Sequence, residues 1–122
     1  MNIKAFSKVT ELSPYTIRYY EKAGLLRSIK RNSSGHRAFT ESDVAWARFI
    51  KRLKETGMTI ENIRKYAELR EKGEHTSEQR MRMLEEHAIT LKNKIALENN
   101  HLQKLEEKID YYAGLIHTDL KA

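Results

Sequence analysis

The segment 15–20 concentrates side chains that bind polar ligands: Tyr15, Thr16, Arg18, Tyr19 and Tyr20. A guanidinium such as that of Arg18 can pair with two acceptors at once, which suits guanine O6 and N7 or a phosphate group. Tyr19 and Tyr20 are adjacent and would point about 100° apart on a helix. We therefore expect one hydroxyl on a phosphate and the other ring partly buried. Tyr15 and Thr16 stand where the helix would begin, a usual place for contacts with base edges.

A second group of basic side chains surrounds a turn. Residues 32–35 read Asn-Ser-Ser-Gly and separate two short extended pieces, which is typical of a two-stranded wing. Arg31 precedes the turn, and His36 and Arg37 follow it. We expect these three residues to contact the DNA backbone or the minor groove. Lys54 belongs to a further basic edge that we expect to touch phosphates.

The charge of the chain is concentrated in the part that carries these residues. Residues 1–54 hold twelve Lys or Arg against four Asp or Glu, whereas residues 55–122 hold eleven against thirteen. The first part therefore has a net charge of +8 and the second a net charge of −2. This asymmetry fits a nucleic-acid-binding head joined to a near-neutral element with another role. A basic but merely solvated surface is the alternative that charge alone leaves open.

Other chemistry has little support in the sequence. The absence of cysteine among the 122 residues excludes disulfides, thiolate metal sites and cysteine nucleophiles. The five histidines are scattered, and the sequence shows neither a carboxylate–histidine cluster nor a glycine-rich phosphate loop. We predict no enzyme, no cofactor and no metal site. Apolar runs do not approach about 18 residues, so we also predict no membrane contact and a cytoplasmic location.

The elements that must position these side chains begin with two short helices. Apolar residues recur every three positions between residues 3 and 12, as on one face of a helix. Ser13 then suits an N-cap and Pro14 the first position of a second helix. This second helix is expected to run over 15–23 and to end at Gly24. The pair predicts a helix-turn-helix.

Two more helices are expected before a linker. The first begins at Thr40, where Asp43 is the acidic partner of a capping box, and the second begins at Thr59. We therefore assign residues 1–70 to a winged helix-turn-helix domain and residues 71–76 to a linker.

The segment 77–116 has the pattern of a coiled coil, and residues 117–122 are expected to form a tail. Its apolar residues recur at alternating spacings of three and four, which is typical of a heptad seam. One helix cannot bury such a seam, so we expect a homodimer. The residues assigned to dimerisation are Leu84, Ala88, Leu91, Ile95, Leu102, Leu105, Ile109 and Tyr112. Glu98 interrupts the seam, where it either pairs with a basic residue across the dimer or marks a local opening.

Three separated blocks resemble the MerR family of bacterial transcription regulators. Residues 16–26 read TIRYYEKAGLL, residues 35–39 read GHRAF, and residues 57–63 read GMTIENI. Their order and spacing make the resemblance specific over the first 70 residues, whereas the coiled coil matches by architecture only. Most members carry tyrosine at the position of His36, so His36 departs from the family pattern. The resemblance therefore does not define the role of this histidine.

The resemblance implies a fold class and a function. The fold would be mainly α, with a winged helix-turn-helix head followed by a long dimerisation helix in an antiparallel coiled coil. The dimer would bind an inverted repeat in double-stranded promoter DNA and distort it, thereby acting on RNA polymerase indirectly. The energetic cost of such distortion must be offset by contacts with phosphates. Some members activate transcription, and others only repress it.

The signal is less defined than the DNA-binding head. The sequence is most similar to the short, aldehyde-sensing branch, but it lacks the cysteine that this branch often carries before Gly57. Direct alkylation of that thiol is therefore excluded. A small-molecule effector of unknown identity would have room near Tyr66, Leu69 and His75, between the head and the helix of a partner.

Two other functions compete with a promoter regulator. One is an architectural winged-helix protein of the excision-factor type, which bends DNA without controlling a promoter; the long dimerisation helix argues against it. The other is a scaffold whose coiled coil recruits a partner, and the Arg18-Tyr19-Tyr20 block argues against that.

Overall fold

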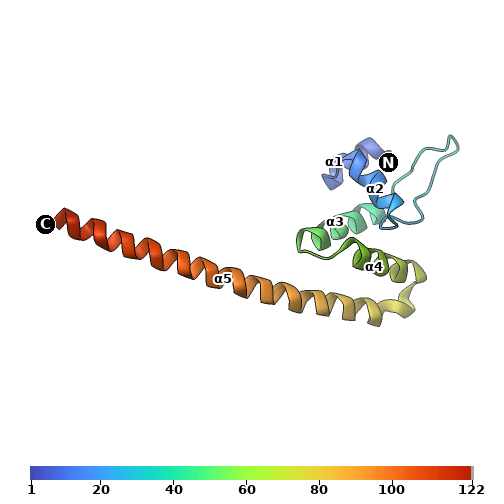
Figure 1. The fold of residues 1–122 in the computed structure, drawn as a ribbon. Coiled ribbons are helices and arrows are strands. Elements are labelled where there is room, and N and C mark those ends of the chain that lie inside the picture. The colour runs from blue at the N-terminus through green and yellow to red at the C-terminus, as the bar shows by residue number, and fades with distance from the viewer. Residues whose placement is uncertain (122) are drawn as a thin grey trace. The chain divides into compact units, whose positions relative to one another are not determined.

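The structure is a computed structural model that describes the backbone of residues 1–121 and the side chains of residues 1–118. The chain divides into two compact units, of which the first is Met1–Glu85 and the second is the rest of the last helix. Figure 1 shows that helices make up the regular structure of the described residues. In chain order they are α1 (Ile3–Thr10), α2 (Pro14–Lys22), α3 (Glu41–Glu55), α4 (Ile60–Lys72), the short 3-10 helix η1 (Glu74–Thr76) and α5 (Ser77–Lys121).

Helices α1 and α2 form the predicted helix-turn-helix, and α1 ends two residues earlier than the apolar repeat suggested. The chain leaves α1 through Glu11, which has a positive φ of 60°. The hydroxyl of Ser13 then accepts a hydrogen bond from the backbone N–H of Thr16 at 3.0 Å, as an N-cap does. Gly24 follows α2 with a φ of +82°, a conformation that side chains disfavour, so the chain can turn sharply there.

Helix α3 begins with the predicted capping box. The backbone N–H of Thr40 donates to Asp43 Oδ2 at 2.9 Å, and that of Asp43 donates to Thr40 Oγ1 at 3.1 Å. Two otherwise unpaired donors are thereby satisfied. The apolar side of α3 is buried in the same core cluster as residues of α2 and α4, so this cluster holds α2 in place.

The junction between α4 and α5 is more ordered than a linker. Residues 71 and 72 belong to α4, and residues 74–76 form η1. The buried hydroxyl of Thr76 hydrogen-bonds the carbonyl oxygens of Leu69 at 2.6 Å and Gly73 at 2.7 Å. Arg80 Nε in turn donates to Thr76 Oγ1 at 3.0 Å. The predicted linker 71–76 therefore consists of the end of α4 and a hydrogen-bonded 3-10 turn, and it is not an irregular segment.

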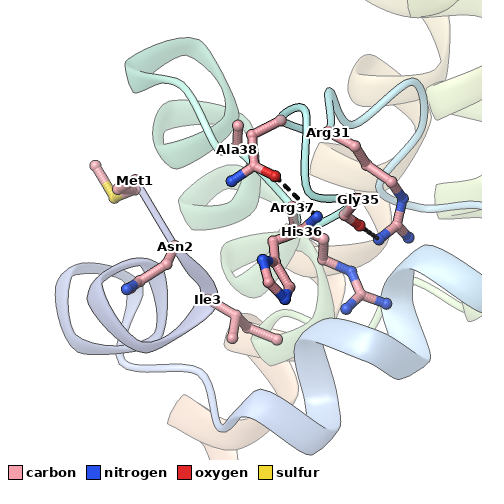
Figure 2. Close-up of a pocket in the computed structure, with 9 residues that line it drawn as sticks. Met1, Asn2, Ile3, Arg31, Gly35, His36, Arg37 and Ala38 are labelled. Atoms are coloured by element: carbon pink, nitrogen blue, oxygen red, sulfur yellow. Dashed lines mark hydrogen bonds between the residues drawn. The ribbon is translucent and has the colours of Figure 1, made fainter.

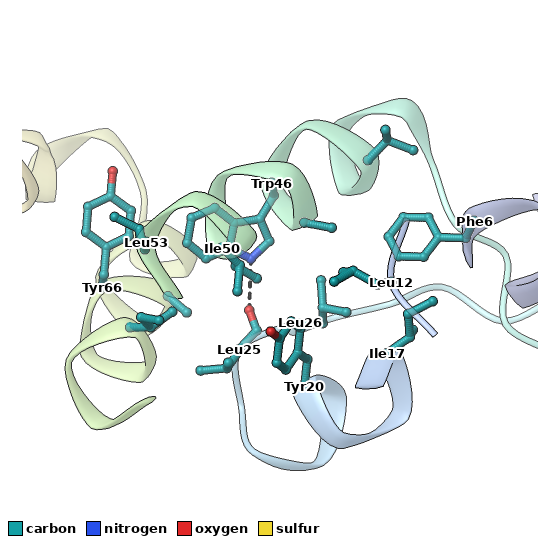
Figure 3. Close-up of a cluster of buried hydrophobic side chains, with 14 of the residues drawn as sticks. Phe6, Leu12, Ile17, Tyr20, Leu25, Leu26, Trp46, Ile50, Leu53 and Tyr66 are labelled. Atoms are coloured by element: carbon teal, nitrogen blue, oxygen red, sulfur yellow. Dashed lines mark hydrogen bonds between the residues drawn. The ribbon is translucent and has the colours of Figure 1, made fainter. Parts of the chain in front are cut away.

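A single hydrophobic cluster fixes the helices of the first unit against one another (Figure 3). Phe6 of α1 stacks on Phe39 with ring centroids 4.0 Å apart. At the other end, Trp46 of α3 stacks on Tyr66 of α4 at 5.6 Å, and its indole N–H donates to the carbonyl oxygen of Leu25 at 2.8 Å. The core thus ties the end of α2 to both following helices. It leaves Tyr15, Arg18 and Tyr19 of α2 exposed.

The wing is present as a loop between α2 and α3, without the two strands that we predicted. One antiparallel β-bridge, between Arg31 and Arg37, is its only β-structure among the described residues. Two further backbone hydrogen bonds support it, from Asn32 to His36 at 2.8 Å and from Ala38 to Lys30 at 2.7 Å. An isolated two-stranded ribbon is marginally stable. Ser28, with a positive φ of 58°, also breaks the extended conformation of the first arm.

Helix α5 leaves most of the predicted seam exposed in the single chain. Ile95, Leu102, Leu105, Ile109 and Tyr112 have exposed fractions between 51% and 64%. Ala88 is also exposed, and Leu91 is half-buried. Leu84 differs, because it packs against the core cluster of its own first unit. The helix also continues past the predicted end at residue 116 to Lys121. Residue 122 of the predicted tail lies outside the described residues.

Candidate nucleic-acid interface

The outer side of α2 presents the residues that the sequence singled out. Tyr15 is 78% exposed and Tyr19 is 46% exposed. Arg18 is exposed as well and makes no hydrogen bond or ion pair with any residue that the structure describes. Thr16 is half-buried, and its hydroxyl accepts a hydrogen bond from Ser13 Oγ at 2.9 Å. A free guanidinium flanked by two phenol rings is an arrangement that can pair with base edges and phosphates.

Tyr20 was predicted as a DNA contact, but the structure places it in the core. Its side chain is only 6% exposed, and its ring lies among Leu25, Leu26 and Ile17 in Figure 3. Burial raises the pKa of its hydroxyl, and the nearby Tyr19 and Glu55 add to that shift. The angle between successive residues of a helix explains the outcome, because only one of two adjacent rings can face out. The exposed ring is that of Tyr19.

The wing arginines are tied to α2 by one carboxylate. Arg37 Nε donates to Glu21 Oε1 at 2.8 Å, and both side chains are 24% exposed. Arg31 Nη2 lies 3.8 Å from the same oxygen, and its Nη1 donates to the carbonyl of Gly35 at 3.1 Å. Glu21 was not among the residues predicted to act at this site. Its position three residues after Arg18 on the same helix was the available signal.

A pocket of about 630 Å³ separates the wing from the start of α1 (Figure 2). Arg31, His36 and Arg37 line its wing side, and residues 1–3 line the other. His36 is exposed, so its ring is available to a ligand, and its contact with DNA stays a prediction. The amino group of Met1 donates to the carbonyl of Phe39 at 2.6 Å. This hydrogen bond joins the C-terminal end of the wing to the first residue of the chain. The three predicted wing residues therefore do lie together.

Lys54 lies apart from the wing, on α3. It is exposed, and its ammonium group makes no ion pair within the described part of the chain. By contrast, Lys51 Nζ lies 3.5 Å from Glu11 Oε2, and Arg48 Nη2 donates to the carbonyl of Val9 at 3.0 Å. Of these three cations, Lys54 is therefore the one left free to bind a phosphate.

The other end of the wing is fastened to α4. The side chains of Arg27 and Ser28 both donate to the carboxylate of Glu71, with the serine hydroxyl at 2.8 Å. The hydrogen bond from Arg27, followed by that from Ser28, lowers the pKa of the Glu71 carboxyl. The charged form of Glu71 is therefore the one that the folded chain favours.

This contact predicts a dependence of stability on pH. A carboxyl whose pKa is lower in the folded chain stabilises it at neutral pH, and this contribution is lost as the pH falls through the lowered pKa. We expect Glu71→Gln to reduce the free energy of unfolding at about pH 7, and the difference from wild type to shrink as the pH is lowered through the pKa of Glu71 in the folded chain. Urea unfolding over a series of acidic pH values measures it. Glu74→Gln is the control, because Glu74 has no arginine partner in the described chain; an equal loss there would contradict the assignment.

The proposed effector residues do not share one environment. The ring of Tyr66 is buried between Trp46 and Phe49, with centroids 5.6 Å and 6.0 Å away, and the guanidinium of Arg70 lies 4.7 Å from the Trp46 ring. Leu69 is half-buried, and His75 is exposed. An effector at this place stays a prediction.

The described residues contain no group of three His, Cys, Asp or Glu side chains placed to hold a metal ion. The described helices are also too polar or too short to cross a membrane.

Comparison with known families gives two matches that together span most of the chain. Residues 1–69 match the model described as MerR HTH family regulatory protein, and residues 44–110 match the model described as MerR, DNA binding. These are families of transcription regulators and not of enzymes. They cover α2, the wing and the first three-quarters of α5, which are the elements that carry the residues discussed above.

Individual relatives agree with the family models. An uncharacterized HTH-type transcriptional regulator of Haemophilus influenzae is 37% identical over 89% of this chain and 80% of its own length. A MerR family regulator of known structure from Listeria monocytogenes has a TM-score of 0.88 and 41% identity, over 92% of this chain and 85% of that one. HiNmlR, a MerR family regulator lacking the sensor domain and solved bound to promoter DNA, has a TM-score of 0.82 and 33% identity, over 91% and 88%. The chain therefore belongs to the MerR family of helix-turn-helix transcription regulators.

Proposed function

We propose that this protein is a homodimer that binds an inverted repeat in promoter DNA through α2 and the wing and distorts the DNA to alter transcription. The observation that carries the proposal is that Arg18 is exposed and unpaired among the described residues, on the same helix as the exposed rings of Tyr15 and Tyr19. Arg31, His36 and Lys54 supply further cations or donors. Of the residues predicted to contact DNA, Tyr20 is left out because it is buried.

The exposed seam of α5 supports the homodimer. Burying one leucine or isoleucine side chain contributes about 1.5–3 kcal/mol, and five large seam residues are more than half exposed in the single chain. A second copy offers the same heptad pattern, so two antiparallel helices can cover each other's seams. Two heads related by a two-fold axis match an inverted repeat, because each head then reads one half-site.

The promoter is the proposed target because of the relatives. HiNmlR was solved on promoter DNA, and family membership favours a regulator over an excision-factor type of DNA-bending protein. A promoter as the ligand supports a cytoplasmic location in a bacterial cell, where RNA polymerase would be affected indirectly through the shape of the promoter. Distortion of the DNA is supported by the number of cations available to phosphates, which can offset its cost.

The test is a footprint on the DNA upstream of the protein's own gene and its neighbours. We expect protection of an inverted repeat, with enhanced cleavage at its centre where the DNA is distorted. We also expect binding to weaken linearly in a plot of log affinity against log salt, as phosphate contacts require. A complex that is equally strong on unrelated DNA of the same length would overturn the proposal in favour of a general DNA-bending protein.

A further inference from the structure

We propose that Glu21 is a positioning residue for DNA binding, which holds the arginines of the wing in the orientation that meets the DNA backbone. This inference rests on the proposed function, since it concerns the same interface. It gives a role to an acidic residue whose charge, by itself, repels phosphates. It also changes the role of Arg37 from an independent contact to one that depends on α2.

The carboxylate of Glu21 lies close to two arginines of the wing. Glu21 lies on α2, one turn after Arg18. Its Oε1 accepts the Nε–H of Arg37 at 2.8 Å, and Arg31 Nη2 lies 3.8 Å from the same atom. These two arginines face each other across the single β-bridge of the wing. One carboxylate oxygen therefore contacts both arms of the wing from the helix proposed to enter the major groove.

The hydrogen bond to Glu21 leaves the terminal amino groups of Arg37 free among the described residues. Arg37 uses its Nε–H on Glu21, and its two terminal amino groups make no hydrogen bond with any residue described here. A guanidinium fixed at Nε has fewer orientations to lose when its terminal groups bind a phosphate. Both Glu21 and Arg37 are 24% exposed, so solvent screens their pairing less than it screens a fully exposed pair.

Few hydrogen bonds hold the wing together internally. The wing has one β-bridge and a few backbone hydrogen bonds, which do not set its orientation relative to α2. Arg27 and Ser28 fasten its base to Glu71 of α4, and the Met1 amino group fastens its other end through Phe39. Glu21 is the contact that ties the middle of the wing to α2. Without it, the two DNA-facing elements lose their fixed relation.

The test compares specific and non-specific DNA binding of the full chain. The probes are a duplex carrying the footprinted repeat and a scrambled duplex of the same length. Glu21→Gln keeps an acceptor oxygen but removes the charge that strengthens the hydrogen bond from Arg37. We expect it to lower affinity for the repeat about tenfold, while affinity for the scrambled duplex does not fall. Glu41→Gln is the matched control, because it removes the same charge from an exposed residue with no ion pair in the described chain. We expect it to leave the ratio of the two affinities unchanged.

Two more variants separate position from charge and from folding. Glu21→Asp keeps the charge but shortens the side chain, so it is expected to lower the same ratio. In Glu21→Gln/Arg37→Gln the losses are expected to overlap rather than to multiply, because both changes break one contact. Urea unfolding of each variant checks that the fold persists.

The outcomes distinguish this inference from the proposed function. A wild-type protein that prefers no sequence overturns the proposed function and the inference with it. A wild-type protein that binds the repeat, with Glu21→Gln changing both affinities as Glu41→Gln does, overturns the inference alone. Wild-type affinity in Glu21→Asp, or multiplied losses in the double variant, would also overturn it.

Discussion

Replacing Arg18 by alanine is expected to abolish most of the sequence preference of this protein while leaving its fold intact. Arg18 is exposed and makes no contact that supports the core, so its removal costs little stability. One bidentate arginine–guanine pair contributes about 1–3 kcal/mol of discrimination, or roughly 5- to 150-fold. A homodimer uses the residue twice, and the loss is then multiplied. Fluorescence anisotropy with a labelled operator measures the effect directly.

The control for this prediction is Lys22→Ala, also on α2. Lys22 is exposed and has no ion pair among the described residues. If Lys22 contacts a phosphate, the dimer loses two such contacts, so we expect this variant to weaken binding to operator and scrambled DNA equally and to reduce the salt slope by about two. If Arg18→Ala behaved in the same way, Arg18 would be a phosphate contact and not a reader of bases.

Placing a charge in the seam of α5 is expected to dissociate the dimer and to lower operator affinity by about 10²-fold or more. Leu105 is 63% exposed in the single chain and is assigned to the seam. Leu105→Glu would bury a carboxylate between two helices, where ionised groups without partners are strongly disfavoured. Separate monomers then lose the effective concentration that links binding at two half-sites. Analytical ultracentrifugation and anisotropy measure the two consequences on one preparation.

The matched control for the seam is Asn100→Glu, which adds the same charge to the same helix. Asn100 is exposed and lies on the outer side of the heptad repeat, away from the seam. We expect this variant to stay dimeric and to bind the operator nearly as well as wild type. A dimeric Leu105→Glu would contradict the assignment of residue 105 to the interface.

The helix starts of the head were predictable because their signals are local. A serine followed by proline, and a threonine three residues before an aspartate, satisfy specific backbone donors within one turn. The structure shows both, at Ser13 and Thr40. The mainly α fold and the family were also predictable, because the three motif blocks are separated but correctly ordered. The strands of the wing were not found, since extended sequence does not become a strand without enough pairing.

The parts that the sequence did not decide depend on contacts between distant residues. Tyr19 and Tyr20 are adjacent, and the sequence alone does not decide which of the two rings is buried. The packing of α2 on Leu25 and Leu26 decides it. Leu84 fits the heptad pattern, but it packs against the head's own core. The contact between Glu21 and Arg37 joins residues 16 positions apart. Charge counting gave these two residues opposite roles, and only their geometry shows that they act together.

The stacked environment of Trp46 also provides an optical probe of the DNA-binding head. This is the sole tryptophan of the chain, so its emission has one source. Its indole N–H donates a hydrogen bond to the carbonyl oxygen of Leu25, directly after the turn that ends α2, and its ring contacts both Tyr66 and the guanidinium of Arg70 on α4. A shift of α2 relative to α4 would alter both the polarity around the indole and its quenching. Intrinsic fluorescence can therefore follow strain in the head during DNA binding without any attached dye.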